Sequence, residues 1–357
     1  RLFRRERFPL SSLFLPTYDT RVTGEMLRFG LPWAIGAAMP GIGILLQSIL
    51  LERFLLPFGL STTSWLTLIR FTAVFEILLI SLYRGLIPGL TEAATFDYKT
   101  LLRYYVSQGI RYGAWFSFFL FSIVGAFGPP ALSMAPTPWA QSDLRLWLVP
   151  LAAWGALRWA VWLPDRMLEA AGRPGWVSAL TIIEQVIRIG GAYVLLQLWG
   201  PAGLPAAYAV ALLVRAIMAK WVAGRFLVKA RIYIWQTLIV PAIGGLIVYE
   251  LLQVLNLVLL PTTWQGVSIT TIALVLPALL LYAFFTAMLG GWDDGSLREL
   301  RRATRMSGIG RPFAWLLLQV VAFGARHSPL HNRFPIHLYE LAQDEAQALS
   351  YAQRPPS

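Results

Sequence analysis

The stretch WVSALTIIEQVIRIGGAYVLLQLW, residues 176–199, decides the fold class of this chain. It is apolar over a length that reaches the roughly 20 residues a helix needs to cross a bilayer. Its only charged side chains are Glu184 and Arg188. A stretch of this length and composition predicts a membrane-spanning helix, because strands and the helices of soluble domains rarely stay apolar for so long.

Apolar stretches of similar length recur along the chain, separated by segments rich in Pro, Gly and charge. The composition agrees, since 57% of the residues are hydrophobic and only 13% are charged, against about 25% charged in a soluble domain. We therefore predict an all-α fold, a polytopic integral membrane helical bundle with about eight transmembrane helices. The other predicted spans are 29–50, 64–87, 110–128, 144–164, 203–223, 235–258 and 266–290.

The basic residues support this number of spans because they gather in alternate connecting segments. The formal net charge of +12 is carried by the N-terminal arm and by the loops after every second span, whereas the intervening loops hold no Lys or Arg except Arg53. This alternation predicts that both ends of the chain are cytoplasmic. The basic loops are therefore expected to face an anionic membrane surface, and we expect no nucleic-acid partner. The absence of cysteine excludes disulfides and thiolate metal sites.

Two C-terminal segments are expected to be helical without crossing the membrane. The apolar run PFAWLLLQVVAFGA, residues 312–325, is too short to span and predicts an interfacial helix. The polar run 339–353 predicts a short helix.

Charged side chains inside the predicted spans are the candidate binding residues, because a charge in a bilayer needs a partner or a cavity. Glu184 and Arg188 are four residues apart, so they share a helix face and can pair directly or line a cavity for an anionic group. Arg158 is always charged and needs a carboxylate, a cavity or a phosphate, and Glu76 is a plausible partner. The predicted binding residues are Arg70, Glu76, Arg158, Glu184 and Arg188.

Other charges near the predicted spans have simpler interpretations. Asp165, Arg166 and Glu169 are expected to form a solvated helix end. Lys220 can extend its ammonium group to the interface. For Arg215 the sequence leaves open whether it is a binding residue or, like Lys220, extends its charged group to the interface.

Motifs for catalysis are weak. The pair Asp293–Asp294 could hold a metal–diphosphate group, but helix capping explains it as well. His327 and His331 have helical spacing, but Pro329 between them disfavours a helix. We therefore expect no enzyme activity, cofactor or metal. A membrane-embedded glycosyl or acyl transferase using Asp293 or a tail histidine is an alternative.

Four segments carry a family resemblance. They are GEMLRFGLPWAIG (24–36), SLYRGLIPGLTEAA (81–94), WLPDRMLEAAGRPGWVSALTIIEQVIR (162–188) and GPAGLPAAYAVALLVRAI (200–217). Together they resemble the second lobe of polysaccharide flippases in the multidrug/oligosaccharidyl-lipid/polysaccharide (MOP) superfamily, although Pro205 departs from the family's pattern. The resemblance implies a transporter of polyprenyl-diphosphate-linked saccharides in the cytoplasmic membrane of a prokaryote. Arginines would hold the diphosphate, while Glu76 and Glu184 would balance charge or bind a coupling cation.

The same resemblance suggests how the chain is divided. The divisions are a basic cytoplasmic arm (1–25), a six-helix lobe (26–230), two additional transmembrane helices (231–292) and a cytoplasmic segment with the interfacial helix and polar tail (293–357). Such transporters need two lobes around a cavity, so we expect a further lobe in a longer chain or on a partner membrane subunit. Membrane lipids and a lipid-linked saccharide are the other expected partners. The alternative is a degenerate lobe that serves as a non-transporting structural subunit.

Overall fold

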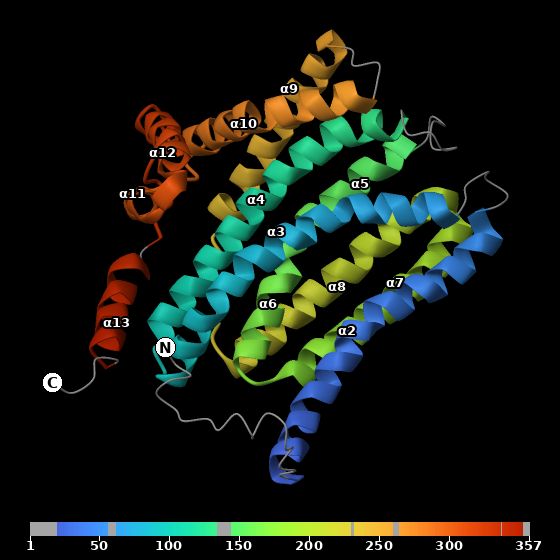
Figure 1. Cartoon of the computed structure of the whole chain (residues 1–357), viewed down its shortest axis with the longest axis horizontal. Coiled ribbons are helices and arrows are strands. Elements are labelled where there is room, and N and C mark those ends of the chain that lie inside the picture. The colour runs from blue at the N-terminus through green and yellow to red at the C-terminus, as the bar shows by residue number, and fades with distance from the viewer. Residues whose placement is uncertain are drawn as a thin grey trace, which may run out of the picture.

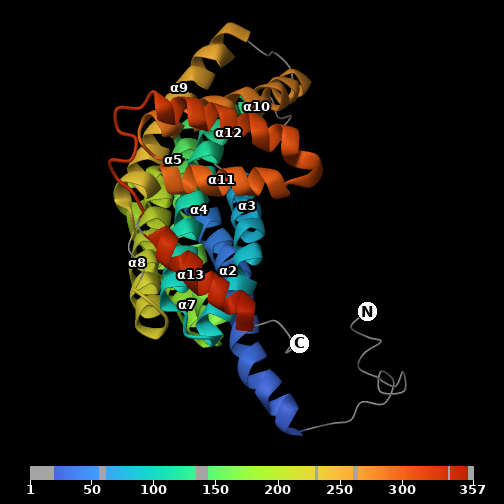
Figure 2. The same cartoon turned by 90° about the vertical axis from the view of Figure 1, so that its left-hand side faces the viewer.

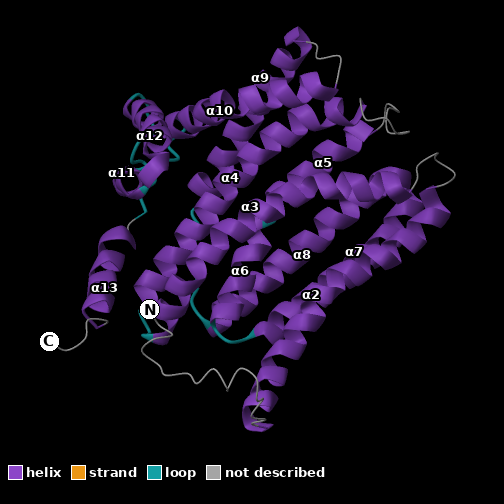
Figure 3. Cartoon of the chain, viewed as in Figure 1, coloured by secondary structure: helices purple, strands orange, loops and turns teal. Residues whose placement is uncertain are grey.

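The computed structural model describes residues 20–55, 62–133, 144–229, 232–259, 264–336 and 338–352. These residues form helices joined by short connections, with no strand among them (Figure 3), so the predicted all-α fold is confirmed for this part of the chain. Residues 1–19, which make up most of the predicted N-terminal arm, lie outside the described residues. His337, one of the tail histidines, also lies outside them. The helices are α2 (Thr20–Leu55), α3 (Thr62–Thr95), α4 (Lys99–Ser133), α5 (Leu144–Ala156), α6 (Trp159–Ala170), α7 (Pro174–Trp199), α8 (Gly203–Phe226), α9 (Val240–Leu259), α10 (Trp264–Met288), α11 (Asp294–Met306), α12 (Arg311–Arg326) and α13 (Leu338–Ala352).

Eight helices among the described residues are long and apolar enough to cross a membrane, as expected for an integral membrane protein. Most coincide with predicted spans, but one is Gly308–Arg326, which includes α12 and was predicted to be interfacial. Figures 1 and 2 show α12 running across the direction of α3 and α4, which is the orientation of an interfacial helix. The cytoplasmic placement of both chain ends stays a prediction.

The predicted span 144–164 is wrong as a single helix. The chain divides there into α5 and α6, with a turn at Leu157 and Arg158 between them. The bonds at the turn reach back three residues, from the Arg158 amide to the Gly155 carbonyl at 3.2 Å and from the Ala160 amide to the Leu157 carbonyl at 3.1 Å. Such bonds tighten the backbone locally. Figure 1 shows α6 leaving the direction of α5.

The bundle is built around two packed groups of helices. Helix α7 packs between α2 and α8, and α8 packs in turn on α5 and α6; α3 and α4 pack against each other and against α5 and α6. Small residues permit the closest approach, since a Cβ at Gly36 or Gly43 of α2 would collide with Ser178 or Gln185 of α7. Glycines therefore let the backbones of α2 and α7 approach closely at this contact.

The C-terminal helices extend the bundle from α4. Helices α9 and α10 pack on α4, α12 packs on α10 and α11, and α13 packs on the first half of α4. The carboxylate of Glu345 in α13 accepts hydrogen bonds from the backbone amides of Thr100 at 3.3 Å and Leu101 at 2.6 Å. It thus satisfies amides in the first turn of α4, where negative charge is favourable. The predicted helix over 339–353 is confirmed as α13.

Candidate functional site

Arg215 lies at the centre of a cluster of buried charges. It is 6% exposed and projects from α8. One guanidinium nitrogen donates to Asp165 Oδ2 of α6 at 2.6 Å, and another donates to Glu184 Oε2 of α7. Both carboxylates are buried. A single arginine therefore connects three helices, because its planar fork can donate to two acceptors at once.

Of the two alternatives left open for Glu184 and Arg188, the direct ion pair does not form. Although both side chains lie on α7, the carboxylate of Glu184 is occupied by Arg215 from the neighbouring helix, which packs closely enough to reach it. Arg188 instead donates to Gln185 Oε1. Its guanidinium also lies 4.8 Å from the centroid of the Tyr208 ring, in cation–π contact.

Tyr208 extends this cluster to α2. Its hydroxyl donates to Gln47 Oε1 at 2.7 Å, and both side chains are buried. The ring packs edge-on against Trp65 and Trp154. The hydrogen bond thus joins the first helix of the bundle to the charges carried by α7 and α8.

Arg158 meets Glu76, as the sequence suggested. It lies at the turn between α5 and α6, and its guanidinium forms an ion pair with Glu76 of α3. The same guanidinium lies 4.8 Å from the ring centroid of Trp154 and 5.7 Å from that of Trp162. The side chain of Arg158 is 14% exposed, so the aromatic rings replace much of the water it would have on a surface.

Two further expectations differ from the structure. Arg70 is exposed on α3 and forms no ion pair within the described ranges, so it is not brought together with the other predicted binding residues. Asp165 is 5% exposed rather than solvated, because α8 packs over α6 and supplies Arg215. The expected solvated helix end is thus wrong at Asp165, whereas Arg166 and Glu169 beside it pair with each other.

We call the resulting set the central charge network: Glu76, Arg158, Asp165, Glu184, Arg188 and Arg215. Its three arginines and three carboxylates balance formally, which lowers the cost of burial. Its hydrogen bonds are nevertheless incomplete. Within the described part of the chain, Asp165 Oδ1 and the Nε atoms of Arg158, Arg188 and Arg215 have no hydrogen-bond partner. A buried network with spare donors can exchange partners or accept an anionic group.

Sequence reasoning missed Asp165 and Arg215 as members of the central charge network. It also missed Gln47 and Tyr208, which lie beside the network. A signal for Arg215 was present, since it lies in the middle of the apolar stretch 203–223, whereas Lys220 lies near its end. The argument applied to Arg158, that a buried guanidinium requires a partner, holds equally for Arg215. No comparable signal marks Gln47 or Tyr208.

A buried arginine outside the central charge network lies where α4 meets α11. Arg111 is 3% exposed and donates to the Gly291 carbonyl at 2.7 Å and to Ser296 Oγ. Asp293 lies 4.0 Å from it and caps α11 by accepting from the Ser296 amide at 3.0 Å. It also accepts from the Ile336 amide at 2.9 Å. We call Arg111, Gly291, Asp293 and Ser296 the α4–α11 junction.

Electrostatics at this junction favour an ionised Asp293. Burial alone would raise its pKa, but the Arg111 charge and the hydrogen bonds from Ile336 and Ser296 outweigh burial and lower the pKa below its ordinary value. The interpretation of Asp293 as a helix cap is confirmed. Its neighbour Asp294 contacts His331 at 3.1 Å. Within the described ranges, no three His, Asp or Glu side chains gather as a metal site would require.

Comparisons with known proteins return no match to this chain among protein-family models, curated proteins or solved structures.

Proposed function

We propose that this chain is the transporting lobe of a flippase-type membrane protein that moves a lipid-linked saccharide diphosphate across the membrane. One observation carries the proposal. A helix of the bundle is interrupted at Leu157 and Arg158, and a buried charge network surrounds the interruption. Transporters place interrupted helices and buried charges at their binding sites, because such features are costly elsewhere in a bilayer.

The network suggests how the lobe could handle an anionic head group. In the structure each arginine charge has a partner, so no uncompensated cation is buried between transport events. A diphosphate is a strong acceptor for a guanidinium fork and could displace the carboxylates. The displaced carboxylates would then have to be compensated by a proton or a cation, which would couple transport to ion movement. Exchange of partners between α3, α6, α7 and α8 would accompany movement of these helices.

The test is transport by natively extracted protein in proteoliposomes. Arg158→Gln with Arg188→Gln should reduce transport of a labelled lipid-linked saccharide at least about tenfold, because each lost guanidinium–phosphate bond costs roughly 1.5–3 kcal/mol. Arg84→Gln is the matched control, since Arg84 is exposed on α3. To separate function from folding, Glu76→Gln with Arg158→Gln removes a whole ion pair and leaves the network balanced. Unchanged transport in both double variants would end the site assignment.

The charge balance also favours a second candidate function. A non-transporting structural subunit would pair its buried charges internally, as the central charge network does. Transport of labelled lipid by the protein would exclude this function. The intact mass of the natively extracted chain adds a second criterion. A mass near 39.9 kDa would require any further lobe to come from a partner subunit, and a mass near twice that value would place it on the same chain.

A further inference from the structure

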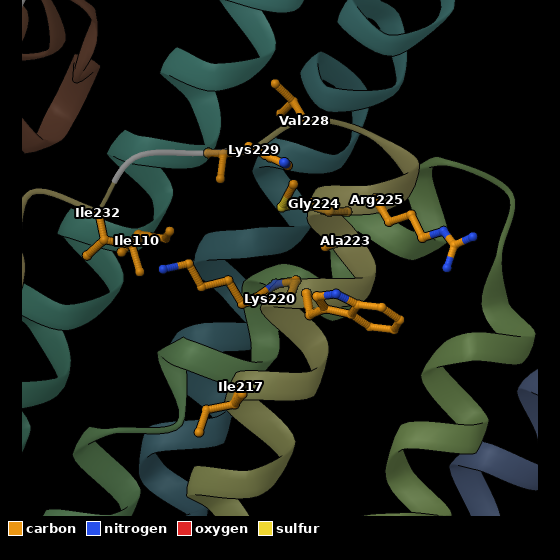
Figure 4. Close-up of a pocket in the computed structure, with 13 residues that line it drawn as sticks. Ile110, Ile217, Lys220, Ala223, Gly224, Arg225, Val228, Lys229 and Ile232 are labelled. Atoms are coloured by element: carbon orange, nitrogen blue, oxygen red, sulfur yellow. The ribbon is translucent and has the colours of Figure 1, made fainter.

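A cavity of about 800 Å³ lies at one end of the bundle, outside the central charge network. Its walls come from α4, α6, α8 and the segment that follows α8, as Figure 4 shows. The wall residues are mostly apolar and include Val106, Ile110, Met167, Ile217 and Trp221. The volume lies within the range of about 300–1,000 Å³ that is typical of small-molecule sites.

Three cations belong to the lining of this cavity. They are Lys220, Arg225 and Lys229, and all three are exposed. Figure 4 shows the Lys220 side chain extending toward Ile110 and the Arg225 guanidinium on the opposite side. No Asp or Glu is among the described residues that line the cavity. The cations therefore have no opposite charge within the lining itself.

This combination selects one class of ligand. A soluble anion would gain nothing from the apolar walls, and an uncharged lipid would gain nothing from three cations. A phospholipid with a net negative head group satisfies both, because its acyl chain can lie along the walls while its phosphate meets the cations. Basic pockets between membrane helices bind anionic lipids for this reason.

We propose that the cavity binds one anionic phospholipid, with its phosphate at Lys220 and Lys229 and an acyl chain against Ile110 and Ile217. The site lies where α8 leads into the connection to α9, so the bound lipid would tie that connection to α4 and α6. The inference does not rest on the proposed transport function, because it uses none of the residues of the central charge network.

The experiment uses the purified full chain and native mass spectrometry with equal amounts of phosphatidylglycerol and phosphatidylcholine of identical acyl chains. We expect the chain to retain phosphatidylglycerol preferentially. Lys220→Gln with Lys229→Gln should reduce that preference about 25-fold, since each basic residue near an anionic lipid contributes about fivefold. Arg301→Gln with Arg305→Gln removes two exposed charges from α11 and should change the preference less than about twofold.

A third variant tests the cavity itself without changing charge. A Cβ at Gly224 would make only ordinary contact with Lys229, so Gly224→Leu is expected to fold and to fill part of the cavity. It should reduce retention of both lipids. Melting temperatures close to that of the parent chain would show that the variants are folded.

Three outcomes would overturn the proposal. The first is an unchanged lipid preference in the folded lysine double variant. The second is displacement of phosphatidylglycerol by inorganic phosphate, which would indicate a soluble-anion site. The third is displacement by a polyprenyl phosphate at equal concentration, which would assign the cavity to the tail and phosphate of a lipid-linked substrate instead.

Discussion

The central charge network and the α4–α11 junction both bury arginine beside carboxylate, but they differ in how completely their hydrogen bonds are made. At the junction, Asp293 accepts from two backbone amides, and Arg111 donates to a carbonyl and a hydroxyl. In the central network, Arg215 is shared between two carboxylates, and three guanidinium Nε atoms lack partners among the described residues. The junction is thus held by fixed backbone groups, whereas the network is held mainly by side chains that can move.

This difference separates a structural arginine from one suited to function. Backbone acceptors cannot leave without unfolding a helix end, so the junction has one arrangement. Side-chain carboxylates can be exchanged for one another or for a ligand, so the network can have several. The presence of a buried ion pair therefore does not distinguish a structural role from a functional one. The groups to which its side chains bond are the better criterion.

The largest expected effect is at the junction. Arg111→Met should lower the free energy of unfolding by about 3–5 kcal/mol, because it leaves Asp293 buried beside no cation and the Gly291 carbonyl without its donor. Thermal unfolding in detergent measures this. Arg111→Met with Asp293→Asn should recover part of the loss. A melting temperature unchanged by the single substitution would show that the junction is not structural.

Arg215→Met should cost less, about 2–3 kcal/mol, although it removes the partner of two carboxylates. The charges of Arg158 and Arg188 also act on Glu184, so the network can partly rearrange. The neutral triple variant Asp165→Asn, Glu184→Gln, Arg215→Met should restore stability but not transport. Full transport by the stable triple variant would contradict a functional network. A loss in Arg215→Met as large as in Arg111→Met would erase the distinction between the two regions.

Glu76→Gln should have a smaller effect, about 1–2 kcal/mol, because its side chain is 36% exposed and water can reach the Arg158 guanidinium after the change. The aromatic rings of Trp154 and Trp162 also remain in place to hold the cation. Unfolding midpoints of this variant and of Glu52→Gln, an exposed control on α2, provide the comparison. A loss equal to that in Arg111→Met would mean that this pair is as rigid as the junction.

The sequence was sufficient to predict the apolar helices, because length and hydropathy are local properties. It also suggested Glu76 as a partner for Arg158, since buried opposite charges tend to meet. It could not choose between Arg188 and Arg215 as the partner of Glu184, because that choice depends on which helix packs against α7. The same limit explains the errors at Asp165 and over 144–164, where a neighbouring helix and a local turn decided the outcome.

The smallest expected effect concerns Glu299, which lies in α11 and can accept a hydrogen bond from Tyr112 at 3.4 Å. Burial raises its pKa to about 7, despite the opposing charge of Arg302. Because this pKa lies above the ordinary value of 4.5, the folded chain binds more protons than the unfolded chain between these two pH values. The contribution of Glu299 to stability should therefore fall as pH rises through that window and stay constant above it.

Glu299→Gln should remove this pH dependence of the free energy of unfolding, which we expect to be on the order of 1 kcal/mol after solvent screening. Melting temperatures of the two proteins between about pH 5 and pH 8 measure it, with the exposed Asp344→Asn on α13 as a control. If the parent and Glu299→Gln lose stability in parallel, the proton is bound elsewhere. If only the parent does, Glu299 of α11 titrates in this window, while Asp293 at the start of the same helix keeps a pKa below its ordinary value. The contribution of Glu299 to stability would then be greatest at acidic pH, while the hydrogen bonds of Arg111 to Gly291 and Ser296 do not depend on its protonation.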